Sequence, residues 1–226
     1  MRMFDELYRE VTACRKCPRL VQFRESVEPR ACFKGETYWK KPVPGFGDEK
    51  AWLLILGLAP AAHGGNRTGR ILTGDLTAKF LFEALFKMGW SNLPQSLHLG
   101  DGLKLNGLYL TASVKCVPPQ DKPTPVESAS CHSYLTEEIH LLTHLKAVLC
   151  LGKIAFDAAK KYAEREGYPN RGITFAHGAR YDIPGLFTLW GSYHTSPRNT
   201  NTGRLTPAMF LSLLKKIEQD YNGKRI

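Results

Sequence analysis

An apolar run, AWLLIL over residues 51–56, leads directly into the glycine-rich stretch GLAPAAHGGNRTGRILTGD over residues 57–75. This junction constrains the fold more than any other part of the chain. The aliphatic run predicts a buried strand, and helix-forming residues follow the glycines from Asp75 onward. Strand, glycine-rich loop and helix in this order are typical of α/β proteins, which place ligands at such junctions. We therefore predict a ligand pocket over residues 57–75.

The composition of this loop indicates polar ligand chemistry. Its glycines allow the backbone to approach a ligand closely. The loop lacks both GxGxxG and the GK[ST] of a phosphate loop, so it does not match the common nucleotide-binding motifs. Asp75 is either an ordinary helix N-cap or a carboxylate facing the pocket. Side chains that can donate to phosphate or sugar oxygens are Asn66, Arg67, Thr68, Arg70 and Thr73.

Strands and helices alternate along the chain. This order predicts a three-layer α/β/α fold with a mostly parallel, four-stranded central sheet. We expect one domain over residues 1–226, with an irregular insertion over about 18–48, where Pro, Gly, Lys and aromatic residues show no periodicity. The predicted strands are 51–58, 108–114, 147–151 and 187–190, and the predicted helices are 4–13, 75–88, 153–166 and those beginning at Thr124 and Thr206.

The loop after the last predicted strand, YHTSPRNTNTGR, should meet the first loop at the same edge of the sheet. His194 in this loop either donates to a developing anion or simply hydrogen-bonds the backbone. Ser196, Arg198 and Asn199 match a phosphate-contacting loop, and Pro197 could stiffen a wedge pressed into a base step.

The charge balance points to a polyanionic partner. The chain carries 31 Lys and Arg against 21 Asp and Glu, a net charge of +10, which favours nucleic acid. No stretch is long and apolar enough for a membrane span, and the charged amphipathic start does not resemble a signal peptide. We expect a cytoplasmic protein, associated with the nucleoid if it binds DNA, with no membrane partner.

Four of the six cysteines form two pairs. Cys14 and Cys17 form a CxxC motif, while Cys116 and Cys131 flank a predicted strand-to-helix connection. Two thiolate pairs suit one tetrahedral metal or one [4Fe–4S] cluster, and the spacing does not separate zinc from iron–sulfur. Free or buried thiols remain the alternative. Cys150 lies in an apolar run that predicts core packing, and the role of Cys32 is open.

Taken in order, these motifs resemble the uracil-DNA glycosylase superfamily, and most of all its family 5, or type b. Residues 57–75 are similar to the first motif of this family. The CxxC motif, together with KCVPP and a later Cys, is similar to its iron–sulfur framework, and YHTSPRN is similar to its last motif. The resemblance extends from Cys14 to Arg204. It implies a [4Fe–4S] cluster on Cys14, Cys17, Cys116 and Cys131.

The resemblance also implies the catalytic groups. His194 acts on the departing base, and Asp75 is the carboxylate that replaces the Glu of family 4, where Leu58 stands in this chain. Asn66, Arg67 and Arg70, with Ser196, Pro197, Arg198 and Asn199, would hold the DNA. The implied base pocket comprises Gly57, Leu58, Ala59, Pro60, Ala61, His63, Leu72 and Ala112.

Two positions depart from the family 4 pattern. Ala112 and Ser113 stand where a uracil-reading Asn is usual, and Leu72 stands where an aromatic ring often stacks on the base. Stacking would then be weaker or come from Phe46 or His63. A pocket with fewer hydrogen-bonding groups discriminates less, so we expect other deaminated bases such as hypoxanthine besides uracil.

The resulting hypothesis is a monofunctional DNA glycosylase of base excision repair, monomeric, that flips its target base out of the duplex. The charge and the cysteines fit a non-catalytic iron–sulfur protein that binds nucleic acid or senses redox state equally well, but such a protein needs neither loop. A zinc-stabilised nucleotide hydrolase would require several carboxylates near the pocket, and only Asp48 and Asp75 are near.

Overall fold

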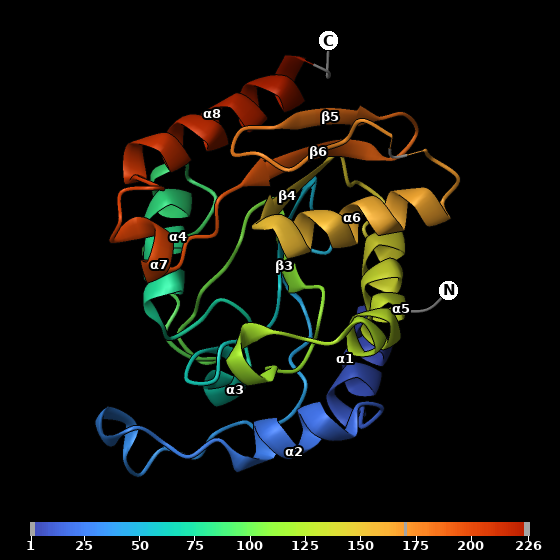
Figure 1. Cartoon of the computed structure of the whole chain (residues 1–226). Helices are drawn as coiled ribbons and strands as arrows, with labels where there is room; N and C mark the ends of the chain where they lie inside the picture. Colours follow the sequence, from blue (N-terminus) through green and yellow to red (C-terminus); the bar gives the residue numbers. More distant parts are fainter. Residues whose placement is uncertain (1–2, 170, 224–226) are drawn as a thin grey trace.

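The computed structural model of the protein describes residues 3–169 and 171–223. Six strands form one sheet in the order β1-β3-β2-β4-β6-β5 (Figure 1). The four inner strands are parallel to one another, as the sequence predicts. The strands are β1 (Phe46–Gly47), β2 (Leu53–Gly57), β3 (Leu108–Ala112), β4 (Ala147–Leu151), β5 (Arg180–Ile183) and β6 (Phe187–Ser192).

The sheet differs from the prediction at both edges, because it is six-stranded and mixed instead of four-stranded. β1 and β5 pair antiparallel with β3 and β6. β1 has only two residues and lies in the aperiodic segment, so it gives no alternating pattern. β5 and β6 form a hairpin through Pro184 and Gly185, a dipeptide that marks a turn.

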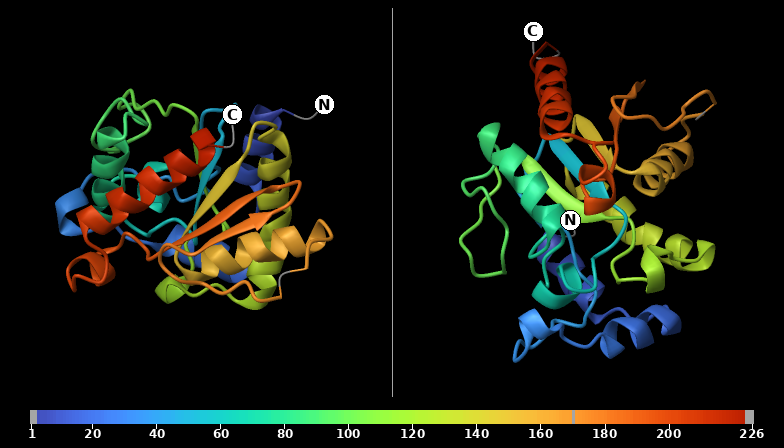
Figure 2. Two further views of the ribbon diagram at one scale, coloured as in Figure 1. Left: turned by 90° about the horizontal axis from the view of Figure 1, so that it is seen from above. Right: turned by 60° about the vertical axis from the view of Figure 1, so that its left-hand side comes forward.

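Helices cover both faces of the sheet, which confirms the three layers (Figure 2). Leu53 and Ile55 of β2 pack on the side of α4 (Leu76–Lys87) and α8 (Pro207–Gly223). Leu54 and Leu56 face α5 (Pro125–Leu141) and α6 (Lys153–Arg165). Because both faces are covered, the inner strands are buried along their whole length and are mostly apolar, without alternating exposed polar residues.

The amino-terminal part contains α1 (Phe4–Ala13) and α2 (Pro18–Ser26), then the short helix η1 (Ala31–Phe33). α2 corrects the prediction of an irregular segment from residue 18. Pro18 occupies its first turn, and Leu20, Val21 and Arg24 form a narrow buried stripe in an otherwise polar sequence. So narrow a stripe gives little helical periodicity in the sequence.

The loops that follow β2, β3, β4 and β6 leave the same edge of the sheet, and backbone hydrogen bonds join the ends of β2 and β3 and the ends of β4 and β6. Ser113 N donates to Gly57 O at 3.0 Å, and Gly152 N donates to Ser192 O at 2.8 Å. These loops carry the short helices α3 (Gly65–Thr68), η2 (Pro119–Asp121) and α7 (Pro197–Thr200). Among the described residues, no helix has the length and apolar character required to span a membrane.

Candidate active site

Asp75 is both a helix cap and a wall residue of a cavity. Its Oδ1 accepts a hydrogen bond from Ala78 N at 2.8 Å, which confirms the N-cap of α4. Its Oδ2 lies directly against Gly64, because a Cβ built there would clash with it. A side chain at position 64 would therefore displace the Asp75 carboxylate. Burial raises the pKa of the Asp75 carboxyl above its usual value.

The cavity beside Asp75 has a volume of about 810 Å³. Its wall combines Asp75 and Lys79 with His63 and Arg67 of the first loop, and with Phe33 of η1. Sequence reasoning missed the contribution of η1, since no periodic pattern singles out this segment. The cavity is large enough for a nucleotide-sized ligand, within the usual range of small-molecule sites.

His63 is held in this wall by aromatic neighbours. The Tyr38 hydroxyl lies 2.9 Å from His63 Nδ1, and the Phe33 ring stacks on the imidazole at 6.5 Å between centroids. Burial, together with nearby Arg30 and Arg67, lowers the pKa of His63. The His63 side chain is therefore held in the cavity wall, and its imidazole is neutral at neutral pH.

Arg67 is fully engaged by the protein itself. Its Nε donates to His63 O at 2.8 Å and its Nη2 to Gly74 O at 2.9 Å. Its Nη1 forms an ion pair with Glu36 at 2.7 Å, and the guanidinium lies 3.9 Å from the centroid of Phe33. These bonds close the loop around the cavity. They leave few donors for a phosphate, so the predicted DNA contact by Arg67 is not supported by its geometry.

The Arg70 side chain is buried and bonded to other side chains of the protein. It pairs with both carboxylate oxygens of Asp101, and it also donates to Ser96 Oγ and Thr73 Oγ1. The side chains of the ion pair are 6% and 7% exposed. The predicted DNA contact by Arg70 is not supported by its geometry, because its donors are used inside the protein. It fixes the segment around residues 96–101 against the first loop.

Asn66 is also buried, with 1% of its surface exposed. Its amide donates to the backbone carbonyl of Arg24 at 3.1 Å, and its own carbonyl accepts from Lys40 N. This joins the first loop to α2. The geometry therefore does not support the predicted DNA contact by Asn66, since the side chain is used within the fold.

His194 is built into the last loop by local hydrogen bonds. Its Nδ1 accepts from Ser196 N at 3.2 Å, and its carbonyl accepts from Asn199 Nδ2 at 2.8 Å. Its Cβ lies 3.6 Å from the position of a Cβ on Gly152, at the end of β4. Burial lowers the pKa of the imidazole. With Nδ1 accepting, the neutral ring carries its proton on Nε2, which can donate.

The last loop also places the other predicted DNA contacts. Ser196 is the N-cap residue of α7 and Pro197 its first residue. Arg198 is exposed, whereas Asn199 is half-buried and supports His194. Of the arginines predicted to contact DNA, Arg198 is thus the one whose side chain is exposed to solvent.

The implied base-pocket residues lie at the carboxyl edge of the sheet. Gly57 and Ala112 are the last residues of β2 and β3 and pair directly with each other. The Leu58 carbonyl accepts from Val114 N at 2.9 Å. Leu72 is 8% exposed and has φ of +50°, a left-handed conformation that is uncommon for leucine and typical of constrained sites.

Among the described residues, the cavity wall contains Asp75 and His63 but not His194, Leu72 or Ala112. Pro60 is buried and Ala61 exposed, with the Ala61 carbonyl capping the turn into α3. Ala59 packs beside the cysteines. Phe46, a candidate for base stacking, instead lies in β1 under the Arg70 guanidinium.

The four paired cysteines come together, as the sequence predicts. Cys14, Cys17, Cys116 and Cys131 line one small enclosed cavity between α1, α2, the end of β3 and α5. Within residues 3–169 and 171–223, no group of three or more His, Cys, Asp or Glu is arranged to hold a metal ion.

The chemistry of these thiols also bears on what they can hold. Burial raises the pKa of Cys131 to about 12 and raises those of Cys17 and Cys116. Thiolates therefore form here only when a bound cation offsets their charge. Cys150 is fully buried in β4, which confirms core packing, and Cys32 is exposed at the rim of the cavity beside Asp75.

Comparison with known proteins decides the family. The uracil DNA glycosylase superfamily matches residues 44–218, a span that includes Asp75, Cys116, Cys131 and His194. The chain belongs to this superfamily. The resemblance stated from the motifs is thereby confirmed.

Relatives within the superfamily place the chain more closely. It is 48% identical over 210 residues to a type-5 uracil-DNA glycosylase of Thermus thermophilus, covering 92% of this chain and 94% of the relative. A type-5 enzyme of Pyrobaculum aerophilum is 41% identical, covering 96% and 93%. A type-4 enzyme of Archaeoglobus fulgidus is 29% identical over 69% of this chain and 62% of its own length. The chain is thus more similar to type 5 than to type 4.

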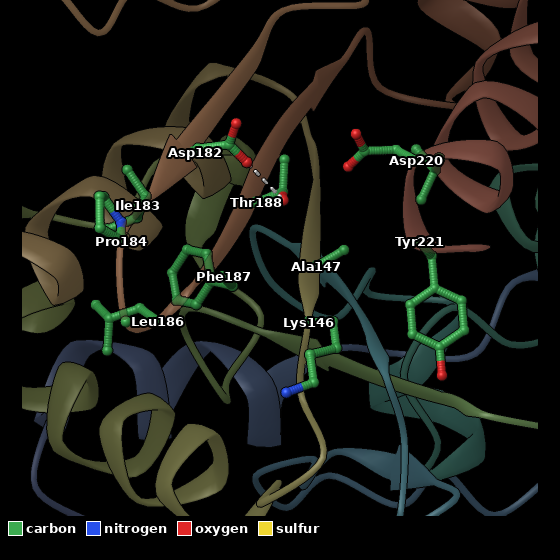
Figure 3. A pocket seen from close by; sticks show the side chains of 12 residues that line it. Lys146, Ala147, Asp182, Ile183, Pro184, Leu186, Phe187, Thr188, Asp220 and Tyr221 are labelled. Atoms are coloured by element: carbon green, nitrogen blue, oxygen red, sulfur yellow. Dashed lines mark hydrogen bonds between the residues drawn. The ribbon is translucent and has the colours of Figure 1, made fainter. Parts of the chain in front are cut away.

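A second cavity, of about 520 Å³, lies away from the superfamily motifs (Figure 3). Its wall includes Ala147 and Phe187, where β4 and β6 begin, and Ile183, where β5 ends. Asp182 accepts from Thr188 Oγ1 at 3.1 Å within it. Ligands of open α/β sheets bind at the carboxyl ends of the strands, so the cavity beside Asp75 is the better candidate.

Proposed function

We propose that this chain removes uracil from DNA by hydrolysing the N-glycosidic bond, as a type-5 uracil-DNA glycosylase acting in base excision repair. The observation that carries the proposal is the half-buried Asp75 carboxylate in the wall of a nucleotide-sized cavity, within the matched superfamily region. The type-5 relatives match over nearly the whole chain, including both loops.

The proposed mechanism uses one residue from each loop. The target nucleotide is flipped out of the duplex towards the carboxyl edge of the sheet. As the bond to C1′ breaks, positive charge develops on the sugar and negative charge on the base. The Asp75 carboxylate stabilises the cationic sugar and orients a water molecule, accepting its proton as hydroxide adds to C1′. His194 Nε2–H donates to the base oxygen that gains charge.

The proposed substrate range is wider than uracil. At the end of β3, Ala112 offers no amide to the base, and Ser113 Oγ donates to the Leu58 carbonyl at 3.0 Å. A site with few groups that read the base rejects analogues weakly. We therefore include hypoxanthine among the substrates. Arg198, with Ser196 and Pro197 beside it, is the proposed contact to the DNA backbone.

The proposed cofactor is a [4Fe–4S] cluster held by Cys14, Cys17, Cys116 and Cys131. The support is one enclosed cavity with four thiols in its wall and a buried cation, Arg24, among them. When bound, the cluster would cross-link α1 and α2 to the sheet by iron–thiolate bonds, a structural role. Brown purified protein with about four irons per chain would support this assignment, and bound zinc would contradict it.

Replacing His194 by alanine is expected to lower the single-turnover rate of uracil release by about tenfold to a thousandfold, since one positioned donor is lost. The measurement is a rapid-quench assay on a uracil-containing duplex with enzyme in excess. His140→Ala is the matched control, because His140 is exposed and contacts Glu166 and the Tyr162 ring, neither of which is a predicted site residue. A wild-type rate for His194→Ala would remove His194 from the mechanism.

The experiment that tests the whole proposal uses duplex oligonucleotides carrying uracil or hypoxanthine. Purified protein is incubated with each duplex, and the products are analysed with and without alkali treatment. Strand breaks only after alkali establish a monofunctional glycosylase. Breaks without alkali indicate an amine nucleophile, for which Lys79 in the cavity wall is the first candidate. DNA binding without abasic sites from any base favours the non-catalytic iron–sulfur protein.

A further inference from the structure

Arg24 is a buried cation beside the cysteine cavity. Its side chain is 2% exposed, although it belongs to a helix on the outside of the molecule. Nη1 donates to Cys116 Sγ at 3.0 Å and to the Cys14 carbonyl at 3.3 Å. The guanidinium therefore contacts one ligand thiol directly and the backbone of another.

The charge of Arg24 is poorly balanced by the protein. Among the described residues its ion-pair contact is Glu25 at 3.6 Å, and that carboxylate is 41% exposed and also binds Arg15. Arg24 Nε is buried with no hydrogen-bond partner in the described part of the chain. Leaving a charged donor buried and unsatisfied costs free energy, so a negative group in the adjacent cavity would complete this arrangement.

The guanidinium is also held in place. The Arg24 carbonyl accepts from Asn66 Nδ2 at 3.1 Å, which anchors this turn of α2 to the first loop. The neighbouring Cys131 Sγ accepts from Lys115 N at 3.4 Å. Donors to two of the four sulfurs are therefore present in a preformed cavity.

We propose that Arg24 is a hydrogen-bond donor to the sulfur atoms of the bound cluster, and that it sets the cluster's reduction potential and its retention. This rests on the proposed [4Fe–4S] assignment. Four thiolates around the cluster give a net negative group, and reduction by one electron adds a further negative charge. A buried guanidinium stabilises the reduced form more than the oxidised form, so it raises the potential.

The test compares Arg24→Met, Arg24→Lys and Lys16→Met in purified holoprotein. Lys16 is the matched control, because it also lies in the wall of the cysteine cavity but is exposed and rests on the Tyr134 ring at 4.8 Å. Iron and sulfide are quantified, the potential is titrated with an external one-electron reductant, and bleaching by a chelator is timed.

Arg24→Met is expected to lower the potential and to weaken iron retention by about tenfold to a hundredfold. Arg24→Lys should recover part of both effects, and Lys16→Met should match wild type. Wild-type values in Arg24→Met, or an equal shift in Lys16→Met, would overturn the proposal. If Arg24→Met does not fold, as judged by circular dichroism, Arg24→Lys decides, and a wild-type potential in it counts against a role for the guanidinium.

The same samples distinguish failure of the cofactor proposal from failure of the glycosylase proposal. Wild-type protein without iron overturns the cluster assignment and this proposal together. If the iron-free wild-type protein still releases uracil, the glycosylase proposal stands, because the activity assay tests Asp75 and His194 and does not measure the cluster.

Discussion

Replacing Asp75 by asparagine is expected to lower the single-turnover rate of uracil release by about tenfold to a thousandfold without loss of stability. Asparagine is as good an N-cap as aspartate, so the bond to Ala78 N is retained. It lacks the negative charge that would stabilise the cationic sugar and accept a proton from water. Rapid-quench kinetics and thermal unfolding of the same samples measure the two effects.

Asp75→Ala separates the two roles further. It removes the cap as well as the carboxylate, so it should lose activity and also about 0.5–2 kcal/mol of stability. If Asp75→Asn keeps wild-type activity, the residue is only a helix cap and the proposed mechanism is wrong. If Asp75→Asn loses as much stability as Asp75→Ala, then asparagine does not preserve the hydrogen bond to Ala78 N, and the argument from the N-cap is wrong.

The pH dependence provides a control for the same assignment. Burial raises the pKa of Asp75, and the reaction requires its ionised form. The rate should therefore fall as the pH decreases through this raised pKa. Burial lowers the pKa of His194, so its imidazole is the neutral donor form at neutral pH. In Asp75→Asn the acid limb assigned to Asp75 should be absent, and its persistence would assign it to another group.

The second large effect is expected in the buried ion pair of Lys115 and Glu138. Their side chains are 1% and 0% exposed, and Lys115 Nζ lies 2.6 Å from Glu138 Oε2. The same carboxylate accepts from Thr111 Oγ1 and Gly45 N. Glu138→Leu should lower the free energy of unfolding by about 3–5 kcal/mol, because it leaves the Lys115 charge buried and unpaired.

Urea denaturation of the holoprotein measures this loss. The double variant Lys115→Met/Glu138→Leu should recover much of it, since replacing both charges removes the uncompensated one. Asp157→Ala is the control, because its pair with Lys153 is exposed and should contribute less than about 1 kcal/mol. An effect of Glu138→Leu as small as that of the control would show that Lys115 finds another partner or releases its proton.

The sequence predicts the part of the fold that depends on hydrophobic pattern. The four inner strands are short, mostly apolar runs, and the helices that pack on them have recognisable start signals, such as the capping box at Thr124 and Glu127. The edge strands and α2 were not predicted, because a strand of two residues and a helix with a narrow buried stripe give no periodic signal. Their structure depends on contacts distant in sequence.

For a similar reason, the sequence indicates which residues are candidates for the site but does not indicate which partners they bond to in the fold. The catalytic roles expected of Asp75 and His194 come from the family resemblance, because local sequence alone is also consistent with an ordinary helix N-cap and a loop histidine. Arg70 was assigned to DNA because an arginine in a polar loop resembles a phosphate ligand. Its actual partner, Asp101, lies 31 residues further along the chain. Pairing over that distance is decided by the tertiary structure, so the loop sequence alone could not reveal it.

The cysteine cavity has a consequence for the order of folding. Cys14 and Cys131 are separated by 117 positions, and only the completed sheet brings β3 and α5 next to α1 and α2. Closing so long a segment costs chain entropy before any bond across the cavity forms. The folded α/β core has already met this cost, so a group that binds all four thiols would bind the folded chain more readily than the unfolded one. Its insertion would then follow folding in the order of maturation.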